Sequence, residues 1–476
     1  MTLQDNKILQ TMGALADQHQ FEVYVVGGFV RDFFLKRDRS EMDFVVVGDG
    51  IKFARLVAEH LHLPMPAVYQ NFGTAMLKWD EMQLEFVSAR KESYRAESRK
   101  PQVEPADLLA DLSRRDFTIN AMAFALNAGN WGTLVDPFDG MKDLNARLLR
   151  TPLDPSATFS DDPLRIMRGI RFATQLGFTI EVKTLRGMRD MRERLRIISQ
   201  ERITEELLKI LAAPKPSIGF HLLEETEVLE IIFPELLALR GVEEYKGYFH
   251  KDVFNHTLMV LDNLAVVSEK IPLRLAALLH DIAKPRTKAF MEGKGWTFHG
   301  HEEVGSRMLP AIFHRLRLPN DWLKYVQKLT KLHLRPIALT EEECTDSAYR
   351  RLLFQAGEDL EDLLMLCRAD ITSGNVKRRE RHLANFDFVV KRLNEVEEKD
   401  RMRAFQSPVR GDEIMQVCGL TPGPLVGKLK SAIEEAILDG KIPNEHDAAL
   451  AYLLEIKDEI LNGKEPAAHP ASDAGR

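Results

Sequence analysis

The chain has 476 residues, which is enough for about three or four domains. Hydrophobic residues make up 45% of it and charged residues 29%, so it can bury sizeable cores, and its net charge of −7 argues against indiscriminate nucleic-acid binding. It holds no apolar run of about 18 residues and no secretory segment, and its three cysteines are widely spaced. We therefore expect a cytoplasmic protein that has no disulfide framework and does not bind a membrane.

The stretch from residue 24 to 47 predicts a strand, a glycine turn, a short helix and a second strand. Gly27 and Gly28 end the first strand, and adjacent glycines let the backbone approach a phosphate and point its N–H groups at it. Arg31 follows in the first helical turn, where the helix N-terminus already favours an anion. The stretch therefore predicts a phosphate-binding turn; the alternative is an ordinary turn without a ligand.

Glu41 and Asp43 begin the second strand and, by alternation, lie on one face of it. Two neighbouring carboxylates repel each other unless a hard cation lies between them, so the pair predicts a Mg²⁺ site; the alternative is a solvated strand face. A hairpin predicted at 75–79 and 83–87 would bring Glu85 to the same face as a third carboxylate. A phosphate-binding turn and a metal pair joined by one short helix predict phosphoryl or nucleotidyl transfer.

Elsewhere in the first part of the chain we expect a long polar loop at 90–112 and helices at 1–20, 51–62 and 112–126. A loop of that length inside a compact domain is usually functional. In the last of these helices, Arg115 would neutralise a triphosphate, and Asp116 and Asn120 would hold a ribose hydroxyl or brace the site. The alternative is a buried ion pair between Arg115 and Asp116.

Five sequence blocks together indicate a family. They are GGFVRD at 27–32, the E-x-D at 41–43, RRDFTINAMA at 114–123, VDPFDG at 135–140 and DDPLRIMRGIRFA at 161–173. In this order and spacing they resemble the class II tRNA nucleotidyltransferases, which are the CCA-adding enzymes and their bacterial poly(A) polymerase relatives. SQERITEEL at 199–207 resembles the family's next helical motif, so the resemblance spans residues 20–235.

The resemblance implies that Gly28, Arg31 and Arg115 contact the phosphates of the incoming nucleotide. Two Mg²⁺ ions bridged by Glu41 and Asp43 would activate the tRNA 3′-hydroxyl and stabilise the pyrophosphate leaving group. The family's metal pair is usually D-x-D. Glu41 is one methylene longer than Asp, so it would shift the metal or require an adjustment of the backbone.

The resemblance also implies that Asp162 and Arg165 read the base. A carboxylate accepts a hydrogen bond from an exocyclic amine and a guanidinium donates to a ring nitrogen or carbonyl, which selects C and A against U and G. The family has E-D-x-x-R here, and Asp161 stands in place of its Glu. Arg168 and Arg171 lie one and two turns farther along the same helix and would face phosphate or the tRNA end; the alternative is surface solvation.

From residue 245 onward the sequence is helical in character and rich in histidine. The residues of interest are, in chain order, His256, His280, Asp281, His299, His301 and Asp370. The pattern H…HD…D resembles the HD phosphohydrolase domain. It implies a site for Ni²⁺, Mn²⁺, Fe²⁺ or Mg²⁺ whose bound water attacks a phosphoester, and its ligands would be His256, His280, Asp281 and Asp370. His301 and His333 would complete a second metal position; the alternative is a set of histidines that only satisfy core hydrogen bonds.

We expect an elongated α+β protein with an N-terminal α/β head and a mostly α-helical remainder. The expected domains are a nucleotidyltransferase head at 1–150, a helical neck with the base-reading motif at 151–240, an HD domain at 245–400, a helical tRNA-binding tail at 405–462 and a disordered end at 463–476. The neck carries a local basic excess, and a charged run at 374–404 predicts either a solvated helix or contact with RNA.

The expected function is template-independent addition of C, C and A to tRNA 3′ ends from CTP and ATP, with Mg²⁺, by a monomer or dimer. Poly(A) synthesis is the nearest rival, followed by addition of CC only or A only; the loop predicted at 90–112 favours a complete CCA adder or an A adder. The alternative of another class is an RNA-binding HD phosphohydrolase with an inactive transferase head.

Overall fold

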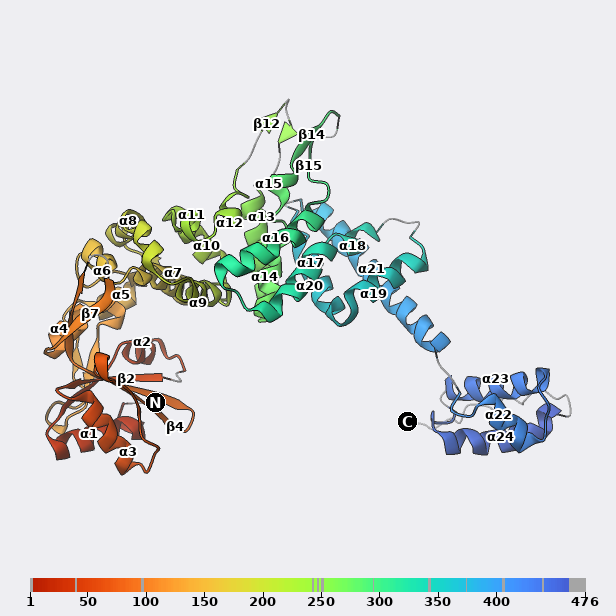
Figure 1. Cartoon of the computed structure of the whole chain (residues 1–476), viewed down its shortest axis with the longest axis horizontal. Helices are drawn as coiled ribbons and strands as arrows, with labels where there is room; N and C mark the ends of the chain where they lie inside the picture. Colours follow the sequence, from red (N-terminus) through yellow and green to blue (C-terminus); the bar gives the residue numbers. More distant parts are fainter. Residues whose placement is uncertain are drawn as a thin grey trace. The chain divides into compact units, whose positions relative to one another are not determined.

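A computed structural model of the chain describes residues 3–38, 41–95, 98–241, 244–245, 248–249, 252–293, 295–340, 344–373, 375–404, 407–438 and 441–461. These residues fall into two compact units (Figure 1), one within 1–344 and 352–389 and the other within 345–351 and 390–476. The finer division into five parts remains a prediction. The end segment expected at 463–476 lies outside the described residues.

A seven-stranded mixed sheet forms the centre of the N-terminal head (Figure 1). In spatial order its strands are β3 (Ala67–Tyr69), β4 (Thr74–Trp79), β5 (Met82–Ser88), β2 (Glu41–Val47), β1 (Glu22–Val26), β8 (Ala123–Ala125) and β9 (Leu134–Val135). The β2 and β5 strands run parallel, and every other neighbouring pair in the sheet is antiparallel. The predicted hairpin of β4 and β5 is confirmed.

The strand register places the acidic residues of β2 and β5 together. Asp43 lies opposite Val26, the last residue of β1, and beside Glu85 of β5. Met42 is 4% exposed and belongs to the core, so alternation turns Glu41 and Asp43 away from it. The carboxylates therefore lie at the end of β1, where the glycine turn begins.

The other face of the sheet is covered by helices. The helices α1 (Lys7–His19) and α3 (Gly50–His60) lie against each other and against the sheet (Figure 1). Their aromatic core is a stack of Phe44 on Phe86 with ring centroids 5.0 Å apart, and Phe53 of α3 meets Phe86 edge-on. Both predicted helices are confirmed, although α1 begins at Lys7 and not at the start of the predicted range 1–20.

Two predictions for the head are wrong. The segment predicted as a loop at 90–112 forms a two-stranded ribbon, β6 (Arg90–Arg95) and β7 (Ser98–Pro105), followed by α4 (Leu108–Ser113). The ribbon is a separate sheet from the central one, so it does not need the apolar alternation that marks a strand in sequence.

The segment predicted as a helix at 112–126 instead contains a 3₁₀ turn, η3 (Thr118–Asn120), and the strand β8. Its apolar residues are almost all buried, and β8 pairs with β1, about a hundred positions earlier in the chain. A short run that is buried on every side has no helical or strand period, and the pairing with β1 decided its structure.

The remaining elements of the head are short. They are η1 (Leu3–Asp5), α2 (Gly28–Leu35), η2 (Gln70–Phe72), η4 (Ala128–Asn130), α5 (Gly140–Ala146) and β10 (Leu148–Leu149). The segment that follows is mostly helical, as the sequence predicts for the neck at 151–240. It consists of α6 (Pro155–Asp161), α7 (Leu164–Leu176), β11 (Thr179–Ile180), α8 (Val182–Asp190), η5 (Arg192–Ile197), α9 (Gln200–Leu211), α10 (Ser217–Glu225), α11 (Val228–Ile232) and α12 (Pro234–Leu237).

The next part is also mostly helical. Its helices are α13 (Val253–Val267), α14 (Ile271–Leu279), α15 (Lys284–Thr287), α16 (His301–Leu316), η6 (Asn320–Trp322), α17 (Leu323–Leu332), α18 (Arg335–Ala338), α19 (Asp346–Ala356), η7 (Gly357–Asp359), α20 (Leu360–Asp370) and α21 (Val376–Ala404). Two small hairpins accompany them, formed by β12 (Glu244–Tyr245) with β13 (Tyr248–Phe249) and by β14 (Ala289–Met291) with β15 (Gly295–Thr297).

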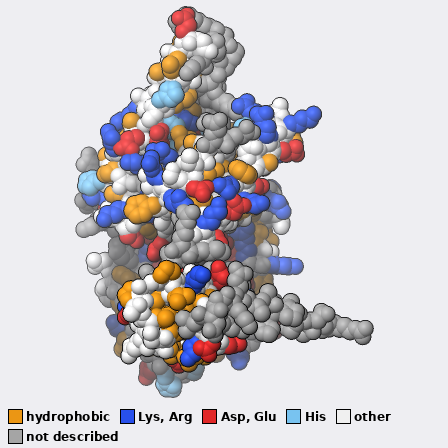
Figure 2. All heavy atoms as spheres, turned by 90° about the vertical axis from the view of Figure 1, so that its right-hand side faces the viewer, with side chains coloured by type: hydrophobic (Ala, Val, Ile, Leu, Met, Phe, Trp, Pro, Cys, Tyr) orange, Lys and Arg blue, Asp and Glu red, His pale blue; other side chains and the backbone are white. Residues whose placement is uncertain are grey.

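Three helices near the C-terminus pack around a core of their own. They are α22 (Gly411–Cys418), α23 (Pro424–Leu438) and α24 (His446–Leu461), and α23 begins with a proline, a residue favoured at the first helical position. On the face of the molecule in Figure 2, acidic and basic side chains are interspersed. That mixture agrees with the small net charge of the chain.

Candidate active site and metal centre

Every site residue that the sequence predicts in the head and the neck lines one cavity of about 1020 Å³. These residues are Gly27, Gly28, Arg31, Glu41, Asp43, Arg115, Asp116, Asn120, Asp162, Arg165, Arg168 and Arg171. Glu85 lines the same cavity, as the strand alternation predicts. The cavity therefore holds both an acidic group and a large set of guanidinium groups.

The glycine turn lies close to Arg115 and to Asp43. Gly27 has φ +70°, a left-handed conformation that favours glycine, and a Cβ added there would lie 2.8 Å from Arg115 Nη1 and 3.6 Å from Asp43 Oδ2. A larger residue would therefore displace the Arg115 guanidinium, which faces the cavity, and would come into van der Waals contact with Asp43. The turn needs glycine both for its backbone and for the space in front of it.

The acidic residues repel one another in the absence of a cation. Burial, together with the charge of Glu41, raises the pKa of Asp43, although the Arg115 guanidinium opposes the shift. Burial and the charge of Asp43 likewise raise the pKa of Glu85. Glu41 is exposed, and Asp43 and Glu85 are partly buried. Carboxylate oxygens are the donors that Mg²⁺ prefers, so the chemistry of these three residues suits a divalent ion.

A chain of hydrogen bonds connects the turn to the neck. Arg31 Nη1 donates to Asn120 Oδ1 at 2.8 Å, Asn120 Nδ2 donates to Asp116 Oδ1 at 3.0 Å, and Arg168 Nε donates to Asp116 Oδ2 at 2.8 Å. Asp116 and Asn120 therefore brace two guanidinium groups from separate parts of the chain. The geometry favours bracing over contact with a ribose, because both side chains are nearly buried and already paired.

The alternative of a buried pair between Arg115 and Asp116 is wrong. Arg115 instead bonds Asp111, whose Oδ2 is 3.2 Å from Arg115 Nη2, and Asp116 pairs with Arg168. Asp111 is 0% exposed and also pairs with Arg114. Asp111 was missed from the sequence, and its position four residues before Arg115 on α4 is the signal that could have revealed it.

The base-reading candidates lie at the start of α7. Asp162 Oδ1 accepts a hydrogen bond from the backbone N–H of Leu164 at 3.1 Å and so caps the helix, while its other oxygen lies 3.9 Å from Arg202. Arg165 is 8% exposed and donates from Nη1 to the Thr158 carbonyl at 3.1 Å. Both side chains are positioned by the protein before any nucleotide binds.

The arginines farther along α7 are held in place and are not simply solvated. Arg171 bonds Glu206, and the ring of Phe172 lies under the guanidinium groups of Arg171, Arg31 and Arg168 at 4.1, 5.1 and 5.4 Å. This aromatic contact was not found from the sequence. Further cavity residues that the sequence analysis does not name as site residues are Arg90, Arg114, Gln175, Arg202 and Lys209.

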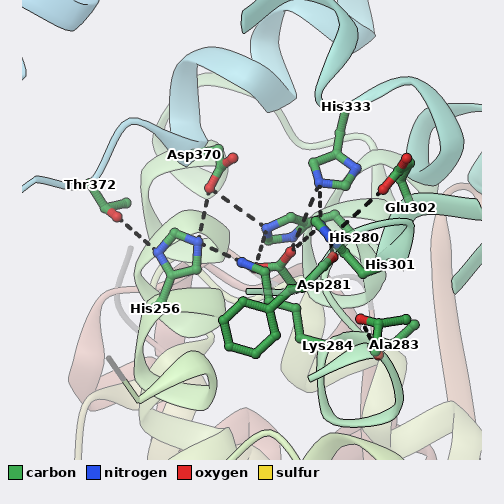
Figure 3. A network of polar contacts seen from close by, with 12 residues as sticks. His256, His280, Asp281, Ala283, Lys284, His301, Glu302, His333, Asp370 and Thr372 are labelled. Carbon is green, nitrogen blue, oxygen red and sulfur yellow. Dashed lines mark hydrogen bonds and ion pairs between the residues drawn. The ribbon is translucent and has the colours of Figure 1, made fainter. Parts of the chain in front are cut away.

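The second site lies in the helical part and consists of histidines and aspartates (Figure 3). His256, His280 and Asp370 form one group, and His256 Nε2 lies 2.9 Å from Asp370 Oδ1. Asp281, His301 and His333 form a second group, and His301 Nε2 lies 3.1 Å from Asp281 Oδ1. The structure thus brings together every ligand predicted for the two metal positions. His299 belongs to neither group.

This centre is strongly charged and mostly buried. Burial alone would lower the pKa of His280, but Asp281 and Asp370 outweigh it and raise that pKa to about 10. Burial and the nearby His280 lower the pKa of His333 to about 4. Such opposite shifts arise from carboxylates and imidazoles crowded together without a cation.

A cavity of about 440 Å³ opens onto one side of the centre. His256 and Asp370 line it, as do Lys284, Arg378 and Phe386. Lys284 Nζ lies 2.6 Å from Asp281 Oδ2, so a cation sits beside the metal ligands. Arg378 comes from the charged run at 374–404, which here contributes to a cavity wall as well as to a solvated helix.

Three family profiles match the chain. Residues 23–150 match the Poly A polymerase head domain, residues 177–239 match the probable RNA and SrmB-binding site of polymerase A, and residues 253–374 match the HD domain. No helix among the described residues has both the length and the apolar run needed to cross a membrane.

Curated relatives share about a third of their residues with this chain. One is the A-adding tRNA nucleotidyltransferase of Deinococcus radiodurans, 34% identical over 72% of this chain and 78% of its own length. Another is the Multifunctional CCA protein of Methylococcus capsulatus, 32% identical over 89% of this chain and 98% of its own length.

Solved structures of similar fold include a tRNA nucleotidyltransferase complexed with a primer tRNA and an incoming ATP analog. It is 25% identical, has a TM-score of 0.58, and the match covers 81% of this chain and 99% of that one. The CCA-adding enzyme of Thermotoga maritima, complexed with tRNA, matches 96% of each chain with a TM-score of 0.57 and 22% identity.

Proposed function

This chain belongs to the family of tRNA nucleotidyltransferases and poly(A) polymerases, and from that premise we propose that it adds C, C and A to the 3′ end of tRNA from CTP and ATP. The chain is a nucleotidyltransferase enzyme. The observation that supports the proposal most is the single head cavity that joins the Gly27 turn, the acidic edge and the arginines of α7.

In the proposed reaction, the carboxylates of Glu41 and Asp43 hold divalent ions, with Mg²⁺ as the ion of choice for an all-oxygen site and Glu85 as a third ligand. When bound, such ions increase the acidity of a 3′-hydroxyl and neutralise a leaving pyrophosphate. Glu41 lines the cavity beside Asp43, so a glutamate at this position still supplies a carboxylate to the site.

The basic residues act on the nucleotide. The N–H groups of the glycine turn and the guanidinium groups of Arg31 and Arg115 bind the triphosphate, and the bracing by Asn120 and Asp111 keeps both guanidiniums oriented before it arrives. This arrangement favours charge development on the phosphates, because the donors do not have to reorganise during the reaction.

For the base, we propose that Asp162 and Arg165 select C and A. Asp162 uses one oxygen to cap α7, which leaves the other to accept from an exocyclic amine, and the buried Arg165 has further N–H groups to donate. Arg168 and Arg171 would contact phosphate or the tRNA end. The tRNA substrate is supported by the family and by the basic excess of the neck.

We further propose that the HD centre is a metal-dependent phosphohydrolase. Its histidine and aspartate ligands suit Ni²⁺, Mn²⁺ or Fe²⁺, and the cations Lys284 and Arg378 in the adjoining cavity would hold a phosphate group. A metal-bound water would supply the nucleophile for a phosphoester.

Three rivals concern what is added: poly(A), CC only or A only. The names of the relatives do not separate them, because both A-adding and multifunctional CCA proteins are similar to this chain at 34% and 32% identity. The rival from another class, an HD phosphohydrolase with an inactive head, is disfavoured by the complete set of cavity residues around Asp43.

The decisive experiment incubates the protein and Mg²⁺ with tRNA that lacks its terminal CCA, with labelled CTP, with ATP, and with both. We expect a tail of C, C and A with both nucleotides. Asp43→Asn should lower incorporation by about 10³-fold or more, because it removes a metal ligand at the reacting centre. His280→Ala is the matched control and should leave incorporation intact. A long A tail or no tail would refute the CCA assignment.

A further inference from the structure

One aromatic ring lies among the guanidinium groups of the head cavity. Phe172 of α7 lines this cavity. The central carbon atoms of three guanidinium groups lie 4.1, 5.1 and 5.4 Å from its ring centroid, and they belong to Arg171, Arg31 and Arg168. We propose that Phe172 is a positioning residue, whose ring holds these three cations in place for the phosphates of the substrates. This role rests on the transferase function proposed above.

The three guanidinium groups come from two separate parts of the chain. Arg31 belongs to α2 of the head, whereas Arg168 and Arg171 belong to α7 of the neck. Arg168 precedes Phe172 by four residues, so the two side chains lie on the same face of α7. Arg31 reaches the ring only through tertiary packing. The ring is therefore a point at which the head and the neck bring their cations together.

Each of these cations also has a carboxylate of its own. Three like charges around one ring would repel one another, and a counter-charge on each reduces that repulsion. A carboxylate binds some of the five N–H groups of a guanidinium, so the ring can still contact the group without competing for those bonds. The pairs are Arg31 with Asp32 at 2.8 Å, Arg168 with Asp116 at 2.7 Å, and Arg171 with Glu206.

The ring of Phe172 is itself fixed in place. It lies at 85° to the ring of Phe117, with centroids 6.1 Å apart, and Phe117 is fully buried. Gly169 leaves room for this packing, because a Cβ added there would lie 2.6 Å from the Phe117 ring. Phe172 is only 7% exposed, so a nucleotide base could not stack on it without displacing a guanidinium. Its effect on the substrate therefore passes through the arginines.

An aromatic ring suits this role because of the way it attracts a cation. Its negative face draws a guanidinium without forming a conventional hydrogen bond, so it restricts the motion of the group and leaves N–H donors for phosphate oxygens. Phosphates that enter the cavity then meet donors that do not have to reorganise. If the ring face becomes less negative while the side chain keeps its size, the cations should be held less firmly and nucleotide binding should weaken.

The test replaces Phe172 in the full chain by phenylalanines that carry one, two and three ring fluorines. Fluorine withdraws electron density from the ring face and changes the volume of the side chain little, so the cation–π contacts weaken stepwise while the packing is kept. The measured quantity is the Kd of an ATP analogue with a methylene group between its α- and β-phosphates, in the presence of Mg²⁺. We expect the Kd to rise at each step, by about 10-fold in total.

Phe220 provides the matched control. It is a fully buried phenylalanine of α10 that does not line the head cavity, so three fluorines on its ring should leave the Kd unchanged. Phe172→Leu removes the ring face and keeps an apolar side chain, and it should raise the Kd at least as much as three fluorines do. Thermal melting without nucleotide shows that each protein is folded.

A Kd that stays constant through the fluorinated series would show that Phe172 only fills space and would overturn the inference. An equal rise with fluorines at position 220 would overturn it as well. The measurement needs neither tRNA nor turnover. A parent chain that binds the analogue with the expected dependence on fluorine, but adds no nucleotide to tRNA, would refute the CCA function and leave the positioning role intact.

Discussion

Single buried carboxylates hold the guanidinium groups of the head cavity, and Asp116 shows this most clearly. It is 6% exposed and pairs with Arg168 through two contacts, at 2.7 and 2.8 Å. Burial alone would raise the pKa of Asp116, but Arg168 and the hydrogen bond from Asn120 outweigh it and hold that pKa well below its usual range. The folded protein therefore stabilises the ionised form.

We predict that Asp116→Asn lowers the unfolding free energy at pH 7 by about 1–3 kcal/mol, because Arg168 loses its charged partner. The folded-state pKa is depressed, so the contribution of Asp116 is complete above about pH 5 and declines as the pH falls below about 4. Denaturant unfolding at several pH values measures this contribution. The difference in unfolding free energy between the parent protein and the variant should become smaller in acid. The control is Asp190→Asn, a substitution at an exposed aspartate. It should change the unfolding free energy little at any pH.

Also at the scale of single residues, the selectivity of the enzyme between nucleotide bases should depend on one carboxylate oxygen of Asp162. Asp162→Ala removes both the base contact and the helix cap, whereas Asp162→Asn keeps the cap and replaces an acceptor by an amide donor. In both variants we expect the ratio of kcat/KM for UTP to that for CTP to rise by about 10-fold. If only the Ala variant is affected, Asp162 acts as a cap and does not read the base.

At the scale of elements, the close packing of α1 on the sheet restricts a single position. A Cβ at Gly13 would lie 2.2 Å from the Leu126 carbonyl oxygen and 2.8 Å from the Trp131 ring. The carbonyl belongs to the backbone beside β8 and cannot rotate away. The absence of a side chain at Gly13 therefore allows α1 to pack closely against the backbone beside β8.

We predict that Gly13→Ala lowers the melting temperature of the head. The substitution gains about 1 kcal/mol of helix propensity, but overpacking against backbone costs about 1–3 kcal/mol, so the clash prevails. Calorimetry measures the outcome. Gly129→Ala serves as control, since nothing lies within 4 Å of its added Cβ. A variant at Gly13 that melted higher than the parent would contradict the packing argument.

At the scale of the whole molecule, the chain carries two centres of different ligand chemistry. The head offers carboxylates alone, among them Asp43, and the HD centre offers imidazoles with carboxylates, among them His280. Hard Mg²⁺ prefers oxygen ligands, whereas Mn²⁺, Fe²⁺ and Ni²⁺ accept nitrogen. The two proposed activities should therefore respond to different ions.

We predict that chelation abolishes both activities and that Mg²⁺ at millimolar concentration restores nucleotide incorporation but not phosphoester hydrolysis. Mn²⁺ or Ni²⁺ in small excess over protein should restore hydrolysis. Parallel assays on one metal-free preparation measure this. Equal recovery of both activities with Mg²⁺ alone would show that the HD centre does not select for nitrogen-binding ions.

The sequence by itself determined the parts that depend on local pattern. Alternation placed Glu41 and Asp43 on one strand face, the two glycines marked the turn, and the blocks from 27 to 207 indicated the family and thereby the roles expected of Asp162 and Arg165. Such signals lie within a few residues of one another, so neighbouring side chains and backbone preferences are enough to produce them.

Only the tertiary structure decided the rest. The strand β8 in place of a helix, the pairing of Asp116 with Arg168, and the gathering of six histidine and aspartate side chains into two neighbouring groups all depend on segments distant in sequence. Burial on every side removes the periodicity that would reveal a strand, and a charged residue shows its partner only once folding has brought the two together.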